Sequence, residues 1–550
     1  MRWGFVLFLA LIISSLPFFI VGFPDGHDAI FELVRVAEFR SSLVNGQFPP
    51  YWGANLYGGH GSPIFLFHPP LYLLVSVLFS VVTGSIASGI IVAMIAFTLV
   101  GIFGIKLVLQ EALGRQRLEC EAASRIAAYF LILNPYLLGD KFLRNANSEY
   151  AALCISPLAI YGLLILGRKR LVGGLILAAG LALTIMAHNI TALVVTALIS
   201  MAALFLYFPV KNISPWMVVI GGIALGLALA AFYWVPALYY LSMIRGDQMT
   251  TGRFDFRSQF QPLGYLFGYS KFFSTGLLVP YVILKSLRIV FDRDRKEFVN
   301  TRLLYFAFGC SLLFVFLQTR ASMPIWETVP YMPFFEFPWR MMGPLAVVTS
   351  IVAGFTFAIL WTGESRKSII IREFLTLLLC TINAVPHLSA TRALPNQIPA
   401  QLAIILKPET IRDAGLSATV SDEYLPRFAD PSDWWSKRFK VGPVVRTLPE
   451  IEVKVLKDTG TKIILETNSP RPARLELKRW FFPGWRCTVN GKPHGLESNA
   501  MGSIDVLVPA GVSQIALELH PPLLRQVTLG LSLTSLLVWF CMLTVALRKK

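Results

Sequence analysis

The chain has 550 residues, of which 55% are hydrophobic, 13% aromatic and only 15% charged. Soluble globular proteins carry about 25% charged residues, so this composition excludes an ordinary soluble enzyme. The net charge of +17 would favour nucleic-acid binding in a soluble protein, but no basic run interleaved with aromatic residues supports that partner. The charge is instead typical of a membrane protein with positively charged cytoplasmic loops.

Apolar runs of about 20 residues recur along most of the chain, and a run of this length crosses a bilayer as a helix. The first run is too long for the core of a signal peptide, and no small-x-small cleavage pattern follows it. We therefore interpret it as the first membrane helix. The expected helical runs are 3–22, 70–83, 86–110, 125–139, 150–167, 171–187, 190–209, 216–236, 273–290, 303–318, 341–361, 372–386 and 523–547.

The run 70–83 is short and is preceded by Pro69, which favours a re-entrant or interfacial segment. We therefore expect about 11 to 13 membrane crossings. Basic residues gather in cytoplasmic loops, so we place both termini in the cytoplasm, together with the clusters Arg115/Arg117/Arg125, Arg168–Arg170, Lys285–Lys296, Arg366–Arg372 and Arg548–Lys550. The segments expected on the outer side are 23–69, 140–149, 237–272, 319–340 and 387–522.

The chain changes character between residues 387 and 522. This region is polar and rich in proline, and several stretches alternate apolar with polar residues, as half-buried strands do. Examples are 452–455, 474–477 and 514–519. Asn490-Gly491 fits a tight hairpin turn. The pattern predicts a small β-sandwich.

Four aromatic residues of this region, Trp480, Phe481, Phe482 and Trp485, are expected in the sandwich core, because aromatic side chains supply large buried area in small domains. The alternative is a platform for stacking carbohydrate. The whole chain is thus predicted to be an α-helical polytopic membrane protein with a β-sandwich on its outer face. Its expected parts are a bundle over 1–386 with a large first outer loop at 23–69, the β domain over 387–522, and a last helix with a basic tail over 523–550.

The first outer loop begins with an amphipathic helical pattern from Asp28 to Leu43. We expect its apolar face to lie on the membrane, with Glu32, Arg35 and Glu38 facing water.

Acidic residues stand just outside the first membrane helix, where Asp25 and Asp28 flank Gly26-His27. Asp28 has three interpretations from sequence. It could cap the helix that follows, act as a general base on an acceptor hydroxyl, or hold a divalent cation together with Asp25.

Short motifs rich in Gly, Pro and aromatic residues follow one another along nearly the whole chain. In the first loop they are Gly26-His27-Asp28, Gly46-x-Phe-Pro-Pro-x-Trp52 and Gly59-x-Gly-x-Pro63 leading to Pro69-Pro70-Leu71-Tyr72. Later ones are Arg144–Glu149, His188-Asn189, Phe232–Pro236, Phe337–Arg340, Glu423–Pro426, Phe482–Trp485 and Val489–Gly491. Together they resemble a bacterial membrane-protein family labelled 6-pyruvoyl-tetrahydropterin synthase-related. Nothing in them resembles the soluble pterin enzyme.

The resemblance implies a GT-C-type architecture, in which a helical bundle bears an acidic residue on a large first outer loop. Such enzymes take a sugar from a polyprenyl-phosphate carrier and transfer it on the outer face. Protein O-mannosyltransferases and lipid A aminoarabinose transferase are relatives in this sense, and His68-Pro69-Pro70-Leu71 is similar to a first-loop motif of the former. Their paired Asp-Glu signature is absent. The resemblance therefore implies Asp28 as the base, with Asp25 as the second choice.

The leaving group implied by the resemblance is a phosphate, which cationic side chains stabilise. The candidates are Lys141, Arg144, Arg253 and Arg340, although Arg340 could also be an interfacial anchor. Glu149, at the start of a helix, could orient Arg144. His188-Asn189 separates two apolar runs, and polar residues at that depth face the bundle interior and mark a site or a helix contact.

The sequence therefore leads us to expect a membrane glycosyltransferase (hexosyl or pentosyl transfer) in the bacterial cytoplasmic membrane. Its expected partners are the lipid bilayer, a polyprenyl-phosphate-linked sugar and an acceptor in the cell envelope, which is a glycan, lipid or protein. No nucleic acid is expected, and the one cofactor considered is a divalent cation. Two alternatives stay open: a transporter or flippase of lipid-linked intermediates, and a non-catalytic envelope assembly protein.

Overall fold

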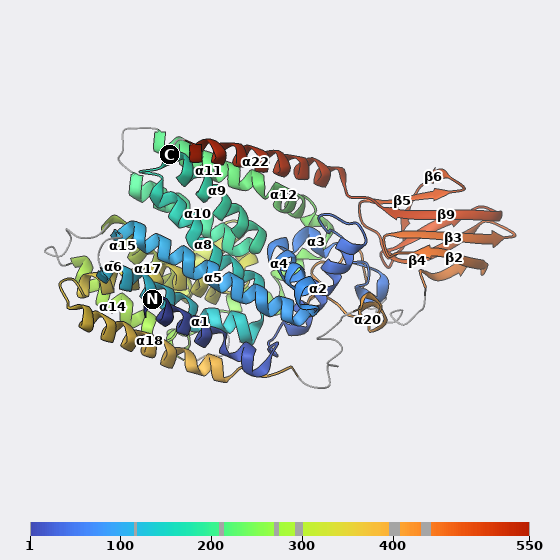
Figure 1. Ribbon diagram of the computed structural model, residues 1–550. Coiled ribbons are helices and arrows are strands. Elements are labelled where there is room, and N and C mark those ends of the chain that lie inside the picture. Colours follow the sequence, from blue (N-terminus) through green and yellow to red (C-terminus); the bar gives the residue numbers. More distant parts are fainter. Residues whose placement is uncertain are drawn as a thin grey trace.

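The computed structural model of the chain describes residues 2–114, 118–207, 214–268, 274–291, 301–394, 407–430 and 442–548. Parts of two expected basic clusters, at 115–117 and 293–296, and the last two residues of the tail lie outside these ranges. Long helices run side by side in one bundle, and two β-sheets stand at one end of it (Figure 1). The two ends of the chain lie away from the sheets, toward the opposite end of the bundle.

The expected helical bundle is confirmed. Its long helices are α1 (Arg2–Val21), α5 (Ile86–Leu113), α6 (Leu118–Ile132), α8 (Asn147–Ile165), α9 (Arg170–Ala187), α10 (Asn189–Tyr207), α11 (Ser214–Leu229), α14 (Leu278–Phe291), α15 (Thr301–Leu317), α17 (Met342–Leu360), α18 (Arg366–Ser389) and α22 (Leu523–Arg548). Shorter helices are α2 (Ala29–Val44), α3 (Ile64–Phe67), α4 (Pro70–Thr83), α7 (Pro135–Leu138), α12 (Ala231–Tyr239), α13 (Leu263–Phe267), α16 (Met323–Thr328) and α20 (Pro408–Asp413).

Within the described ranges, eight helices are long and apolar enough to cross a membrane, or up to eleven if each of three bent helix pairs is one span. The higher count meets the lower end of the expected range. The run 70–83 is the 14-residue helix α4, which begins at Pro70 and stops at Gly84 with a φ of 71°. At about 1.5 Å per residue, it is shorter than the roughly 30 Å hydrocarbon core.

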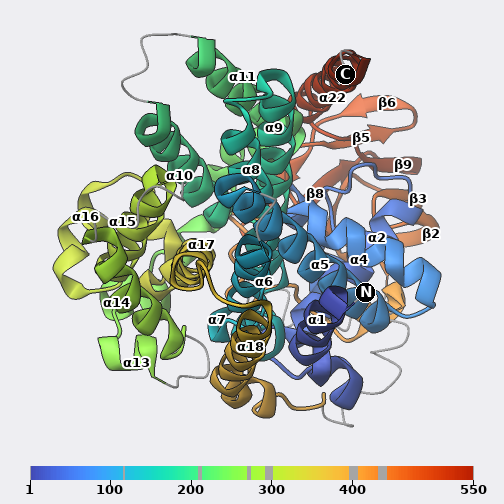
Figure 2. The ribbon, with the colours of Figure 1, turned by 60° about the vertical axis from the view of Figure 1, so that its left-hand side comes forward.

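Glycine residues let α8 and α9 approach closely. A Cβ at Gly162 would lie 2.3 Å from the backbone nitrogen of Leu177, and a Cβ at Gly180 would lie 2.6 Å from that of Ala159. Close backbone approach through small residues is a general way to pack membrane helices, because burial from lipid supplies little hydrophobic driving force. Elsewhere in the bundle, α13–α16 lie on one side of α17 and α1 on the other (Figure 2).

A buried ion pair connects α6 to α18. The guanidinium of Arg125 donates from Nε to Glu373 Oε1 at 2.6 Å and from a second nitrogen to Oε2 at 2.9 Å. The hydroxyl of Tyr129 donates to the same carboxylate at 2.8 Å. Both charged side chains are almost fully buried, so each charge depends on the other for compensation.

The expected β domain before the last helix is confirmed as two antiparallel sheets. The first has the order β1-β4-β8-β7 and the second β2-β3-β9-β5-β6. Leu475 and Leu477 of one sheet and Leu465, Ile515 and Leu517 of the other are buried, as period-2 alternation predicts. The strands are β1 (Val444–Leu448), β2 (Glu452–Asp458), β3 (Lys462–Ser469), β4 (Ala473–Trp480), β5 (Trp485–Val489), β6 (Lys492–His494), β7 (Glu497–Ser498), β8 (Ser503–Val508) and β9 (Gly511–Leu519).

The predicted hairpin turn is also confirmed. Val489 pairs with Lys492, and the two residues between them, Asn490 and Gly491, have φ angles of 52° and 76°. Positive φ at both positions is what a two-residue hairpin requires, and Asn-Gly adopts it at low cost.

Three of the four aromatic residues expected in the core are buried, while Phe481 is partly exposed. Their neighbours include residues of the first loop. Trp485 packs edge-to-face on Trp52, with ring centroids 5.8 Å apart, and Trp480 stacks on His60 at 4.4 Å. These contacts attach the β domain to the first loop.

The start of α22 also holds the first loop. Arg525 donates to the carbonyl oxygens of Pro49 and Pro50 at 2.8 and 2.7 Å, and its guanidinium lies over the ring of Tyr51. Tyr51 in turn donates its hydroxyl to the carbonyl of Leu519 at 3.0 Å. Further along, Ser532 of α22 donates to the carbonyl of Ala228 at 3.0 Å. The last helix thus packs on both the first loop and α11.

The predicted helix at the start of the first loop is present as α2, but its expected orientation is wrong. Glu32, Arg35 and Glu38, which we expected to face water, are buried, whereas Ile30 is exposed. These polar side chains face the surrounding protein because hydrogen-bond and ion-pair partners lie there. Glu38, for example, accepts hydrogen bonds from the backbone and side-chain amides of Asn55 at 2.9 to 3.2 Å.

Candidate functional site

The backbone around Asp28 is held against the segment that precedes α8. The backbone N–H of His27 donates to the carbonyl of Leu143, and that of Asp28 to the carbonyl of Arg144, both at 2.9 Å. Gly26 makes this approach possible, since a Cβ there would lie 1.7 Å from the side-chain oxygen of Asn145. Asp28 is therefore fixed next to Arg144, although 116 residues separate them in the sequence.

Asp28 stands at the N-cap position of α2 but makes no side-chain capping bond. Its carboxylate lies 2.7 Å from His27 Nδ1. Burial alone would raise the pKa of Asp28, but the hydrogen bond from His27 and the charges of Arg35 and Arg144 together lower it below its usual value. The hydrogen bond to Asp28 raises the pKa of His27. Asp28 is thus an ionised, partly exposed carboxylate at neutral pH.

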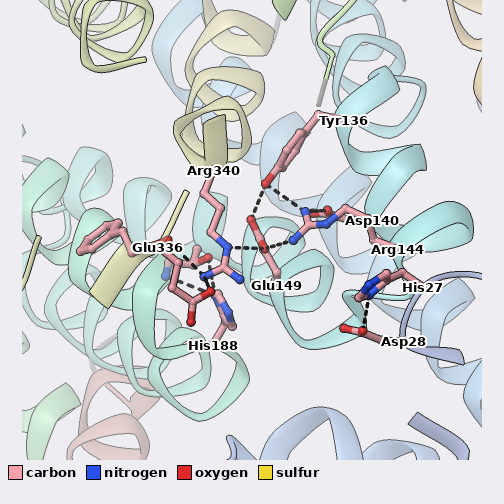
Figure 3. A network of polar contacts seen from close by, with 11 residues as sticks. His27, Asp28, Tyr136, Asp140, Arg144, Glu149, His188, Glu336 and Arg340 are labelled. Atoms are coloured by element: carbon pink, nitrogen blue, oxygen red, sulfur yellow. Dashed lines mark hydrogen bonds and ion pairs between the residues drawn. The ribbon is translucent and has the colours of Figure 1, made fainter. Parts of the chain in front are cut away.

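Arg144 is the centre of a polar network (Figure 3). It ends the short π-helix Gly139–Arg144, and Asn145 then takes a left-handed conformation with a φ of 56°, which turns the chain into α8. Arg144 donates to Glu149 Oε2 at 3.3 Å and to the hydroxyl of Tyr136 at 3.1 Å, and it also pairs with Asp140. Glu149, which the sequence suggested could orient Arg144, contacts it in the structure.

Arg340 joins the same network from the short 3-10 helix Pro338–Met341, which directly precedes α17. Its Nε lies 3.9 Å from Glu149 Oε2, and a terminal nitrogen lies 3.2 Å from Glu336 Oε2. His188 lies beside these groups in the close-up (Figure 3), and its Nδ1 contacts Thr191 Oγ1 at 2.9 Å. The structure thus brings together Arg144, Glu149, His188 and Arg340, four of the residues predicted from sequence.

A second polar group next to Asp28 was missed by sequence reasoning. Arg35 donates to His68 Nε2 at 2.7 Å and lies 3.3 Å from Glu32 Oε1. Burial and the charge of Arg35 lower the pKa of His68 well below its usual value, so this imidazole is neutral and accepts through Nε2. Asn147, at the start of α8, donates to the hydroxyl of Tyr72 at 2.9 Å. The even spacing of Glu32, Arg35 and Glu38 on one helix face was the signal available in the sequence.

Four predicted residues lie outside the Arg144 network, and one of them, Arg253, is exposed. Lys141 is buried, and its amino group donates to the carbonyl of Ser14 and to Ser15 and Thr98. Asp25 is exposed, and its backbone N–H donates to the carbonyl of Arg392. Asn189 accepts from the hydroxyl of Tyr233 at 2.6 Å.

The model of the family described as "6-pyruvoyl-tetrahydropterin synthase related domain; membrane protein" matches residues 65–392, which is more than half of the chain. The chain belongs to this family. It is therefore a multi-pass membrane protein, and the expected resemblance is confirmed. The comparison with curated proteins gave no significant match.

Several solved structures resemble this family member distantly. The oligosaccharyltransferase AglB from Archaeoglobus fulgidus, in complex with an inhibitory peptide and a dolichol-phosphate, has 13% identity and a TM-score of 0.43 over 80% of this chain and 63% of its own. The arabinosyltransferase EmbB from Mycobacterium smegmatis has 12% identity and a TM-score of 0.39 over 94% and 63%. ArnT from Cupriavidus metallidurans, bound to undecaprenyl phosphate, has 11% and 0.29 over 64% and 77%.

This member of the family thus spans less than two thirds of the first of these transferases. Likenesses at this level do not decide its reaction.

The residues around Asp25 and Asp28 do not form a set of metal ligands. No group of three or more His, Cys, Asp or Glu side chains in the described ranges is arranged to hold a metal ion. The carboxylate of Asp28 is directed to His27 instead of toward a second acidic side chain. The divalent cation considered from sequence stays a prediction.

The buried carboxyl of Glu38 gives the family member a pH-dependent stability. Burial raises its pKa from 4.5 to about 7 despite the amide donors, so between these values the folded chain holds a proton that the unfolded chain releases. The contribution of this group to stability is therefore largest below pH 4.5 and decreases by about 3 kcal/mol as the pH rises to about 7. Glu38→Gln should remove this part of the pH dependence.

Thermal unfolding in detergent between pH 5 and 8 measures this effect. The melting temperature of the wild type should fall more steeply with pH than that of Glu38→Gln. Glu409→Gln, at an exposed position, is the control and should keep the wild-type slope. Parallel curves for wild type and Glu38→Gln would contradict the raised pKa.

Proposed function

We propose that the protein is a GT-C-type membrane glycosyltransferase, which moves a sugar from a polyprenyl-phosphate-linked donor to a cell-envelope acceptor. One observation carries the proposal: the ionised carboxylate of Asp28 is fixed by backbone bonds next to the Arg144 network. A base and a cationic group side by side at the start of the first loop are what transfer from a phosphate leaving group requires.

In the proposed reaction, Asp28 accepts the proton of the acceptor hydroxyl as the hydroxyl oxygen attacks the anomeric carbon. The bond between that carbon and the donor phosphate oxygen breaks, and the polyprenyl phosphate leaves with the bonding electrons. Arg144 and Arg340 stabilise the charge on the leaving phosphate through charge-assisted hydrogen bonds. With a single attacking step and one carboxylate, the configuration at the anomeric carbon is inverted. No step is assigned to a metal ion.

The proposed place of the reaction is the outer face of the bacterial cytoplasmic membrane. The helix α2, which Asp28 precedes, and the β domain lie toward the same end of the bundle, away from the two ends of the chain (Figure 1). Exposed basic residues such as Arg168 and Lys169 lie in the turn between α8 and α9. The positive-inside rule then supports cytoplasmic termini and an outer β domain.

The decisive experiment measures whether the protein breaks the bond between the sugar and the phosphate of the donor. Membrane vesicles with and without the protein, at equal total protein, are given a polyprenyl-phosphate donor labelled in the sugar and an envelope extract as acceptor. A transferase produces labelled glycan and free polyprenyl phosphate in equal amounts. A transporter moves the intact labelled donor across the vesicle membrane without releasing polyprenyl phosphate, and that result would replace the proposal.

A further inference from the structure

The two arginines proposed to bind the donor phosphate already have carboxylate partners. Arg144 contacts Asp140 and Glu149, and Arg340 contacts Glu336 and lies near Glu149. Three carboxylates therefore face two guanidinium groups. A donor phosphate entering this site adds further negative charge where little water remains to screen it. Release of one carboxylate from Arg144 or Arg340 would offset the added negative charge and free guanidinium donors for the phosphate.

Two of the three carboxylates are fixed by helices. Asp140 belongs to the π-helix that ends at Arg144 and is completely buried. Glu149 lies in the first turn of α8 and accepts from Tyr136 at 2.7 Å as well as from Arg144. Both side chains are thus held in place by burial and by partners on the two helices.

Glu336 is held differently, because it lies in a turn between short helices and its ion pair is with Arg340. Burial raises the pKa of its carboxyl, and the charge of Arg340 opposes this rise only in part. Desolvation therefore weakens the ion pair.

The backbone at Glu336 is strained in the position that makes this contact. Its φ is 61° and its ψ is −46°, and the N–H of Phe337 donates to the carbonyl of Phe335 at 2.6 Å. These features define a γ-turn of the rare positive-φ kind, which a residue with a side chain adopts at a cost. Tyr331, five residues earlier, also has a positive φ of 66°. The turn that places Glu336 against Arg340 is thus one in which the backbone has an incentive to rearrange.

We propose that Glu336 is an exchangeable counter-ion of Arg340, which the phosphate group of the lipid-linked donor replaces on binding. This inference rests on the proposed function, in which Arg340 holds that phosphate. Glu336 thereby lowers the affinity for phosphate-bearing lipids. It also couples donor binding to the conformation of the segment 329–337, which leads directly into α17. Arg340 is exchanged between two anions and is never left uncompensated.

Glu336→Gln tests the exchange, because the amide keeps the shape of the side chain and removes its charge. The probe is a short-chain polyprenyl phosphate in detergent, with the polyprenol of the same length and inorganic phosphate as separate ligands. We expect Glu336→Gln to bind polyprenyl phosphate about tenfold more tightly than the wild type and to bind the polyprenol equally. A parallel gain with inorganic phosphate locates the effect at the phosphate group, and a gain confined to the lipid shows that the chain contributes.

The matched control is Glu327→Gln in α16, a carboxylate of the same region that pairs with Arg257 at 3.1 Å and is well exposed. It should bind like the wild type. Unchanged or weaker binding of polyprenyl phosphate by Glu336→Gln, with the wild type binding normally, overturns the counter-ion role and leaves the proposed function in place. If neither wild type nor variant binds polyprenyl phosphate, both proposals fail. Glu336→Ala, which also lacks the charge, should repeat the gain if Glu336→Gln fails to fold.

Discussion

Asp28→Asn is expected to lower the rate of sugar transfer by about 10²- to 10⁴-fold, the usual contribution of a general base. The amide cannot accept the proton of the acceptor hydroxyl. Its oxygen can still accept the hydrogen bond that His27 makes to Asp28 at 2.7 Å in the wild type. The backbone bonds that fix this position do not involve the side chain. The fold should therefore survive while the chemistry is lost.

Asp25→Asn provides the matched control. Asp25 is exposed and stands three residues earlier in the same loop, so an equal loss of charge there should leave the rate near that of the wild type. The measurement is the initial rate of labelled glycan formation in membranes adjusted to the same amount of each variant. Equal activity of Asp28→Asn and wild type would remove Asp28 from the mechanism. A loss confined to Asp25→Asn would transfer the role to that residue.

Arg125→Met is expected to reduce the free energy of unfolding by about 3–5 kcal/mol, because it leaves Glu373 as an uncompensated charge in the interior. The pair is nearly inaccessible to water, and Tyr129 completes the set of donors around the carboxylate. The change is measured by thermal unfolding in detergent, in which the amount of protein that stays in solution is recorded at each temperature. Arg168→Met is the control: its partner is Glu111, and its guanidinium is mostly exposed, so the expected loss is below about 1 kcal/mol.

The double variant Arg125→Met, Glu373→Leu distinguishes two effects: the loss of the ion pair itself, and the burial of the Glu373 charge without a cationic partner. If the buried charge is the cause, removing both charges should recover most of the stability that the single variant loses. Equal melting temperatures for Arg125→Met and Arg168→Met would show that α6 and α18 are held by other contacts.

The sequence was sufficient for the bundle, because a long apolar run in a polytopic chain has one stable conformation. It was insufficient for the orientation of α2. The periodicity of Ile30 and Val34 identifies a helix with two unlike faces, but it does not say whether the polar face meets water or other polar groups. Glu32 can be buried because it pairs with Arg35, and Glu38 because it accepts hydrogen bonds from Asn55. Asn55 lies beyond the end of α2, so the helical pattern does not indicate this contact.

The site shows the same division. Glu149 could be linked to Arg144 because five residues separate them across a helix start. The contact of Asp28 with the segment at Arg144, and that of Arg340 with Glu149, depend on how distant helices pack. Lys141 illustrates the converse case. It precedes Arg144 by only three residues, but the π-helix directs it toward α1 and α5, where Ser14 and Thr98 receive its hydrogen bonds.

The hydrogen bonds between the region at the start of α22 and the first loop affect the order in which the chain folds during synthesis. Tyr51 bonds to Leu519, and the carbonyls of Pro49 and Pro50 accept from Arg525. The loop that carries Asp28 therefore leaves the ribosome more than 450 residues before these partners are synthesised. Contacts so distant in sequence form late. A chain truncated before α22 would keep most of its membrane helices, yet its first loop would lack the partners that complete it. Full-length synthesis thus precedes completion of the site.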